Sequence, residues 1–186
     1  MRARIPAVLA MVALVGGALL LHLTEPSDEQ IQGPFVSYAR FGEQVEGRNL
    51  TWIAEDAYLA DRLTSADWIG DTDGVWLVIE GTIGSRLDVT SPDVSVLIGE
   101  RRYIVSNRPG DAALGTSLAA GLPQSGAFVF ELPRAVLESA EGRRVTARFA
   151  TGFRVRLDSA IDMLLDLSQL EHRSTAVLPQ PGVVTS

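Results

Sequence analysis

The sequence predicts a mainly β domain, an antiparallel sandwich or barrel, that follows one N-terminal transmembrane helix. Three observations predict this class. An uncharged apolar run occupies residues 5–23, at least five short segments with strand periodicity come after it, and these segments do not alternate regularly with helices. A nucleotide-binding α/β fold is therefore disfavoured.

The apolar segment at residues 5–23 has the length and the flanking charges of a membrane anchor. A helix rises about 1.5 Å per residue, so this segment spans roughly 28 Å, close to the thickness of a bilayer's hydrocarbon core. Arg2 and Arg4 precede it, and Glu25 and Asp28 follow it. The positive-inside rule then predicts a single-pass protein of the cell membrane, with a cytoplasmic N-terminus and an extracytoplasmic C-terminal domain.

A cleaved signal peptide is the competing interpretation of this leader. Signal peptides have an apolar region of about 7 to 15 residues that ends at a small-x-small site. The one passable site, Val15-Gly16-Gly17, is followed by further apolar residues instead of a polar terminus, which favours an uncleaved anchor. We divide the chain into the anchor (1–24), a juxtamembrane linker (25–43), a β-sandwich domain (44–168) and a disordered tail (169–186).

The most regular strand signal lies at Val75–Ile83. Its β-branched and aliphatic residues alternate, so that one face carries Val75, Leu77, Ile79 and Ile83. The preceding segment, Gly70–Gly74, has the composition of a turn. Val94–Ile98 and Arg102–Val105 flank Gly99, and a glycine there suits the positive φ of a hairpin turn. We therefore expect these two segments to pair.

Two half-buried strands are expected further on, at Ala127–Leu132 and Val145–Phe149, where apolar and polar residues alternate. Between them, Pro133–Ala140 predicts a helical turn, with proline at its first position. Ser106–Gly126 is rich in glycine and proline and predicts a long excursion, of a kind that is usually functional.

Two segments stay ambiguous by periodicity. Thr51–Leu63 alternates through Thr51, Ile53, Ala57, Leu59 and Leu63, but Trp52, Leu59 and Leu63 also fit a helix. Ile161–Leu167 alternates as a strand, and a helix through Ile161, Leu164 and Leu165 competes. The last residues, Glu171–Ser186, carry two prolines and little pattern, so we expect them to be disordered.

The residues also resemble a known family. The segments that carry the resemblance are Asn49–Leu63, Asp73–Glu80, Arg102-Tyr103, Gly121–Pro123 and Phe128–Pro133. They are similar to actinobacterial membrane-anchored proteins with an immunoglobulin-like extracytoplasmic domain of unknown function, akin to the mycobacterial secreted immunoprotective antigen. The resemblance covers Gln44–Leu167. It implies an immunoglobulin-like antiparallel β-sandwich, makes strands of both ambiguous segments, and supplies no functional residues.

Composition excludes several classes of function. All 16 basic residues are arginine, which indicates a GC-rich, bacterial coding sequence. The chain beyond Arg4 contains 14 arginines and 23 carboxylates, which gives it a formal charge of −9. This negative charge disfavours nucleic acid as a partner. The chain has no cysteine, hence no disulfide, thiol nucleophile or thiolate metal site.

Residues with catalytic or ligand chemistry form no motif. The body contains one histidine, His172, in the expected tail, which argues against a Ser-His-Asp triad and a His zinc site. Asp71–Gly74, with Asp67, fails the twelve-residue calcium pattern and is interpreted as a solvated turn. A second buried face explains the tryptophans better than a carbohydrate platform does; these are Trp52, Trp68 and Trp76. We predict no catalytic, cofactor-binding or metal-ligating residue, and no cofactor.

These observations favour a non-enzymatic binding or scaffolding module at the outer face of the membrane. The membrane is contacted through residues 5–23, and an integral membrane protein is the expected partner, with the module as an accessory to a membrane complex. The alternative is a ligand-carrying or envelope-sensing domain with a pocket under the 106–126 loop. An enzyme ranks third.

Overall fold

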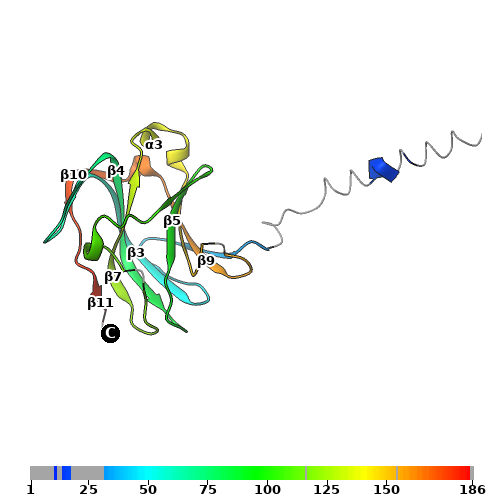
Figure 1. Cartoon of the computed structure of the whole chain (residues 1–186), viewed down its shortest axis with the longest axis horizontal. Helices are drawn as coiled ribbons and strands as arrows, with labels where there is room; N and C mark the ends of the chain where they lie inside the picture. Colours follow the sequence, from blue (N-terminus) through cyan, green and yellow to red (C-terminus); the bar gives the residue numbers. More distant parts are fainter. Residues whose placement is uncertain (1–10, 12–13, 18–31, 116, 154, 185–186) are drawn as a thin grey trace, which may run out of the picture. The chain divides into compact units, whose positions relative to one another are not determined.

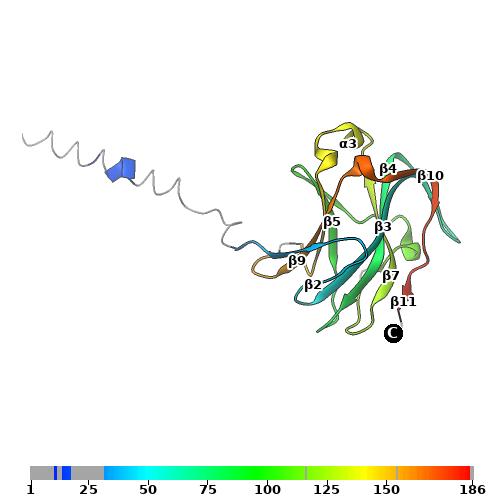
Figure 2. The ribbon, with the colours of Figure 1, turned by 180° about the vertical axis from the view of Figure 1, so that it is seen from behind.

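Two β-sheets pack face to face in the body of the chain (Figures 1 and 2). Sheet A has the strand order β1-β9-β8-β5-β6, and sheet B has the order β10-β3-β4-β7-β11, with β2 paired to β3. The computed structural model describes residues 11, 14–17, 32–115, 117–153 and 155–184. The strands are β1 (Phe35–Ala39), β2 (Gln44–Glu46), β3 (Leu50–Thr64), β4 (Ile69–Ser85), β5 (Asp93–Ile98), β6 (Arg101–Ile104), β7 (Gln124–Leu132), β8 (Val145–Ala150), β9 (Ser159–Leu165), β10 (Glu171–Val177) and β11 (Gly182–Val183).

The predicted β-sandwich is confirmed, but its sheets are not wholly antiparallel. β1 pairs parallel with β9, and β10 pairs parallel with β3. All other named strand pairs among the described residues are antiparallel. β1 and β10 lie outside residues 44–168. The terminal segments therefore add parallel edge strands to an antiparallel body.

β4 has the alternation that its sequence predicts. Val75, Leu77, Ile79 and Ile83 are buried in the core between the sheets. Trp76 and Val78, on the other face of the same strand, are also buried, in a second apolar cluster. The predicted turn at Gly70–Gly74 is wrong, because these residues belong to β4. Sheet B is therefore apolar on both faces.

The first ambiguous segment is a strand, β3, and its predicted face is right at Ala57 and Leu59 but wrong at Thr51, Ile53 and Leu63. The pairing of β3 with β4 shifts between Ala54 and Asp56 and again between Ala60 and Arg62. An extra residue in a strand moves the inward face by one position. Trp52 and Ala54 consequently face the core, where the simple alternation placed Ile53. Trp52 packs there on Phe149 of sheet A, with ring centroids 4.3 Å apart.

The other predicted elements lie close to where the sequence placed them. Ile161–Leu167, the second ambiguous segment, forms most of β9. The hairpin joins β5 to β6 through Gly99, whose φ is 57°. The helical turn after β7 is α3 (Ala135–Glu138), followed by η2 (Glu141–Arg143). Two other short 3-10 turns are η1 (Gly110–Ala112) and η3 (Leu167–Gln169).

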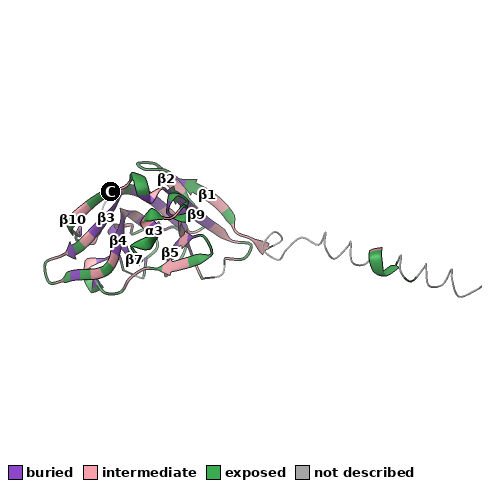
Figure 3. Cartoon of the chain, turned by 90° about the horizontal axis from the view of Figure 1, so that it is seen from above, coloured by how far each residue is buried: buried purple, intermediate pink, exposed green. Residues whose placement is uncertain are grey.

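The expectation of a disordered tail is wrong for most of residues 169–186. β10 lies along the C-terminal half of β3, and β11 pairs with β7. The Arg173 guanidinium stacks on the Tyr58 ring, 3.8 Å from its centroid, and contacts Asp56 at 3.2 Å. β10 is largely exposed (Figure 3), which explains why its sequence lacks an apolar periodicity.

The structure describes part of the predicted linker but only a few residues of the predicted anchor. The predicted linker, residues 25–43, contains β1, so the domain begins earlier than residue 44. Of residues 5–23, only Met11 and residues 14–17 are described, and they are helical. No helix in the described part of the chain is both long and apolar enough to cross a bilayer. The membrane anchor therefore stays a prediction.

The outer face of sheet B is covered by the chain itself. Tyr58, Ala60, Leu63, Trp76, Val78, Ala127 and Val129 form its apolar surface. The same cluster contains Ala113 of the long 106–126 loop, Ala176 of β10 and Leu178, which follows β10. Leu114 and Leu118 of the same loop are buried in the core between the sheets. The loop thus covers and fills apolar surface.

The C-terminal segment allows a direct test with two adjacent residues. Leu178 is 5% exposed and Val177 is 73% exposed. Leu178→Ala should lower the free energy of unfolding by about 2–3 kcal/mol, because it leaves a cavity against the second apolar cluster. Val177→Ala should change it by less than about 0.5 kcal/mol. Urea denaturation of the full chain measures both, and equal effects would mean that the segment is not docked.

Candidate functional site

The outer face of sheet A is the open face of the sandwich. Strand register places Tyr38, Asp162, Arg148, Ser95 and Ile104 in one row across all five strands. A second row holds Leu164, Thr146, Leu97 and Arg102. Three large apolar side chains in these rows are more than 60% exposed: Tyr38, Ile104 and Leu164. This surface, which we call the open face, therefore differs from the covered face of sheet B.

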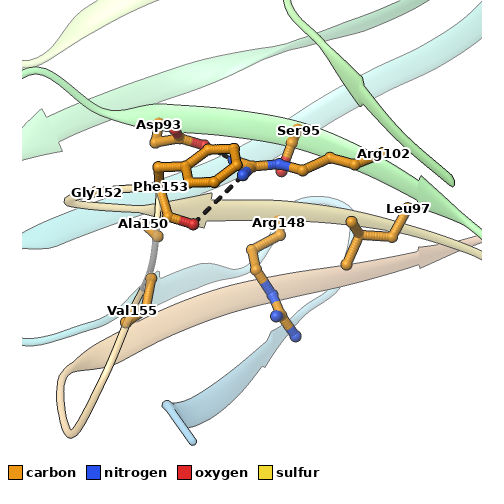
Figure 4. Close-up of a pocket in the computed structure, with 9 residues that line it drawn as sticks. All are labelled: Asp93, Ser95, Leu97, Arg102, Arg148, Ala150, Gly152, Phe153 and Val155. Carbon is orange, nitrogen blue, oxygen red and sulfur yellow. Dashed lines mark hydrogen bonds and ion pairs between the residues drawn. The ribbon is translucent and has the colours of Figure 1, made fainter. Parts of the chain in front are cut away.

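A pocket of about 170 Å³ lies on the open face (Figure 4). Neighbouring strands β5, β6 and β8 form its floor, and the segment after β8 forms its rim. Ser95, at 1% exposure, is the most buried polar residue that lines it. The remaining lining residues are Asp93, Leu97, Arg102, Arg148, Ala150, Gly152, Phe153 and Val155.

Arg102 is held between a carboxylate and an aromatic ring. Its Nη2 donates to Asp93, and its Nη1 donates to the Phe153 carbonyl oxygen at 3.3 Å. The Phe153 ring covers the guanidinium, whose Cζ lies 4.1 Å from the ring centroid (Figure 4). The Nε of Arg102 is buried and has no hydrogen-bond partner within the described residues. This arrangement fixes the rim of the pocket to β6.

Arg148 and Asp162 form a two-pronged ion pair beside the pocket. Nε and Nη2 of Arg148 each donate to one Asp162 oxygen at 2.7 Å. The Asp162 side chain is 6% exposed and that of Arg148 is 31% exposed. The hydrogen bonds that Arg148 donates to Asp162 raise the pKa of Arg148. Both arginines of the pocket are thus neutralised by carboxylates, so its chemistry suits a neutral or apolar group better than a free anion.

A shallow apolar depression adjoins the edge strand of the same sheet. It is lined by Tyr38, Ala39, Arg40, Phe41, Met163 and Leu164. Tyr38 and Leu164 are also the exposed apolar residues of the open face near β1. Clustered exposed apolar side chains on a folded domain indicate an interaction surface.

The residues considered for chemistry lie apart from this pocket. His172 Nε2 lies 3.1 Å from Asp61 Oδ1 on sheet B, and Arg134 donates to the same oxygen at 2.9 Å. The Arg134 hydrogen bond, with a further one from His172, lowers the pKa of Asp61. Asp71 accepts from Arg62 at 2.6 Å. Among the described residues, no group of three or more His, Asp or Glu side chains is arranged to hold a metal.

The tryptophans are accounted for by burial. Trp52 faces the core between the sheets, and Trp76 is buried on the outer face of sheet B. Trp68 is half-buried and meets Trp76 edge-on, with centroids 6.0 Å apart. The second buried face that the sequence predicts is confirmed for Trp76, whereas Trp52 is buried in the first core. Neither Trp52 nor Trp76 offers a platform to a sugar.

Comparison with known proteins supports the fold class. No protein-family model matches the chain, and a search of curated proteins finds no match. Similar solved structures include an uncharacterised β-sandwich protein from Clostridium difficile 630, 9% identical, with a TM-score of 0.50 over 76% of this chain and 99% of that one. The yjhA protein of Bacillus subtilis is 14% identical, with a TM-score of 0.44 over 67% of this chain and 99% of that one. The first likeness defines the class of this chain as a β-sandwich, and it shows the fold alone.

The charge pair beside the pocket predicts a non-additive response to substitution. Arg148→Met should lower the free energy of unfolding by about 3 kcal/mol, because it leaves the buried Asp162 without its partner. The double variant Arg148→Met/Asp162→Leu should recover most of that loss. Arg62→Met, which breaks an exposed pair with Asp71, should cost less than about 1 kcal/mol. Denaturant titration of these variants and of the unsubstituted chain measures the free energies of unfolding. A double variant no more stable than Arg148→Met would refute the pairing.

Proposed function

We propose that the chain is a non-enzymatic, membrane-anchored binding module whose partner docks on the open face. One observation carries the proposal. The chain covers the outer face of sheet B with its own loop and C-terminal segment, but leaves Tyr38, Ile104 and Leu164 exposed on sheet A. A sheet face with exposed apolar side chains and internally paired charges is typical of a protein interface.

The proposed location is derived from the leader. Residues 5–23 form the anchor of a single-pass protein of the cell membrane, and the β-sandwich lies on the extracytoplasmic side. The resemblance to actinobacterial membrane-anchored proteins with an immunoglobulin-like domain supports this topology. The partner is an integral membrane protein, and the module is an accessory to its complex.

The packing of the long loop favours this function over the ligand-carrying alternative. A pocket under the 106–126 loop would need empty space beneath it. Leu114 and Leu118 are buried in the core, and the Leu114 backbone N–H donates to the Ala127 carbonyl oxygen at 2.9 Å. These contacts pack the loop against sheet B. The pocket of the open face lies on sheet A and not under this loop.

Site-directed crosslinking tests the docking face, since the chain has no native cysteine. Single variants Leu164→Cys and Ile104→Cys place a thiol on the open face, and Val177→Cys places one on β10 with similar exposure. We expect a photoactivatable crosslinker in membranes of the native host to join the first two to one common integral membrane protein. The third should not join that protein.

A charge substitution supplies the matched control. Leu164→Asp should abolish the crosslink from position 104, because it places an uncompensated charge in the interface. Val177→Asp should leave the crosslink unchanged. Equal crosslinking from positions 104 and 177, or a soluble small molecule bound in place of a protein, would contradict the proposal.

A further inference from the structure

The loops at one end of the sandwich carry exposed apolar side chains that do not belong to the two rows of the open face. In sheet A, Val36 pairs with Ala160, Ala160 with Ala150, and Ala150 with Asp93. The start of β1, the segment 151–158 and the segment 86–92 therefore meet at the same end. We call this the entry end, because the chain enters the domain there at Phe35.

Exposed apolar side chains concentrate at the entry end. Five of them are between 60% and 71% exposed, and they come from three separate segments: Phe35, Leu87, Val89, Phe153 and Leu157. Such side chains cost free energy in water and are expected singly on a surface, whereas a cluster indicates contact with an apolar phase or a partner. At the opposite end, where β3 turns into β4, Ile69 is exposed to a similar degree, at 68%.

Leu157 carries an additional cost. Its φ is 51°, and it is the one non-glycine residue with positive φ in the described part of the chain. A left-handed conformation costs a residue with a Cβ about 1–2 kcal/mol, and glycine or asparagine would avoid most of it. An exposed leucine at a position that disfavours leucine indicates that its side chain is used outside the domain.

Three ion pairs lie at the entry end, whereas the exposed Asp88 side chain makes none within the described residues. Arg86 pairs with Glu46 at 2.6 Å. Arg102 pairs with Asp93, and Arg48 lies 3.8 Å from Asp158. The chain as a whole has a formal charge of −7, which repels anionic headgroups. The paired charges reduce that repulsion at this end, where the apolar side chains stand.

The short linker between the apolar segment and β1 determines which end of the domain lies near the bilayer. Residues 24–34 separate the apolar segment 5–23 from β1. At about 3.5 Å per residue, even a fully extended chain of this length reaches only about 40 Å. The 15 residues of β3 lead away from the entry end, and at about 3.3 Å each they cover roughly 50 Å. The entry end is thus the one tethered close to the bilayer.

We propose that the entry end lies on the outer leaflet of the membrane and inserts Leu87, Val89, Phe153 and Leu157 into its interfacial region. Aromatic and aliphatic side chains on loops partition favourably into this region, and Phe35 adds a ring where the tether arrives. The inference rests on the proposed anchor at residues 5–23. It goes beyond that anchor, because it assigns a second, side-chain contact that orients the domain.

The contact can be measured on the full chain in phosphatidylcholine vesicles. Val89→Cys and Leu157→Cys place an environment-sensitive fluorophore at the entry end, and Ile69→Cys places it at the opposite end with comparable exposure. Lipids with a nitroxide near the headgroup then quench fluorophores that touch the interface. We expect quenching at positions 89 and 157 to exceed that at position 69 several-fold.

A second variant tests the side chains themselves. Leu87→Asp should reduce the quenching at positions 89 and 157 toward that of position 69, and Ile69→Asp should leave it unchanged. Quenching that is equally low at all three positions overturns the proposal, as does quenching that is equally high. Capture of a protein in place of lipid by labels at positions 89 and 157 also overturns it.

Flotation of the vesicles separates this inference from the proposed anchor. Chain that floats with the vesicles while all three labels stay unquenched has an anchor but no second contact. Chain that does not float has neither, and then both proposals fail. Chain that floats with selective quenching at the entry end supports both.

Discussion

Sheet B is apolar on both of its faces, and the rest of the molecule is arranged around this constraint. Val75, Leu77 and Ile79 point into the sandwich, while Trp76 and Val78 on the same strand point outward. A sheet of this kind cannot leave one face to water without a large hydrophobic cost. The segments that cover the outer face are therefore part of the fold.

The C-terminal segment covers part of the outer apolar face of sheet B, at one edge of the sheet. β10 lies on the free edge of β3, and Ala176 and Leu178 extend the cover over Tyr58 and Leu63. Burial raises the pKa of the Tyr58 hydroxyl, and the hydrogen bond that this hydroxyl donates to Glu80 at 2.7 Å adds to the rise. A buried hydroxyl with a fixed acceptor is stabilising only while the cover is present. The C-terminal segment thus protects both an apolar and a polar part of sheet B.

The sequence predicted those parts of the structure that are periodic over short distances. β4 alternates without interruption through Val75–Ile83, so its core face could be predicted. β3 could not be predicted in the same way, because its two register shifts change the phase without leaving a turn residue as a signal. β10 pairs in parallel with a strand more than a hundred residues away, and its polar, exposed sequence has no period to detect. The pocket combines β5, β6, β8 and a loop, a juxtaposition that depends on strand order, and strand order is not encoded locally.

The open face and the entry end meet at Phe153, and this gives the two proposals a common geometry. The ring of Phe153 covers Arg102 at the rim of the pocket, and the same residue belongs to the entry end. β1 runs from the entry end along the edge of sheet A and places Tyr38 in the first row of the open face. A domain that rests on the leaflet through the entry end would therefore hold its open face beside the membrane surface. An integral membrane protein could reach that face without leaving the bilayer, whereas the self-covered face of sheet B needs no partner.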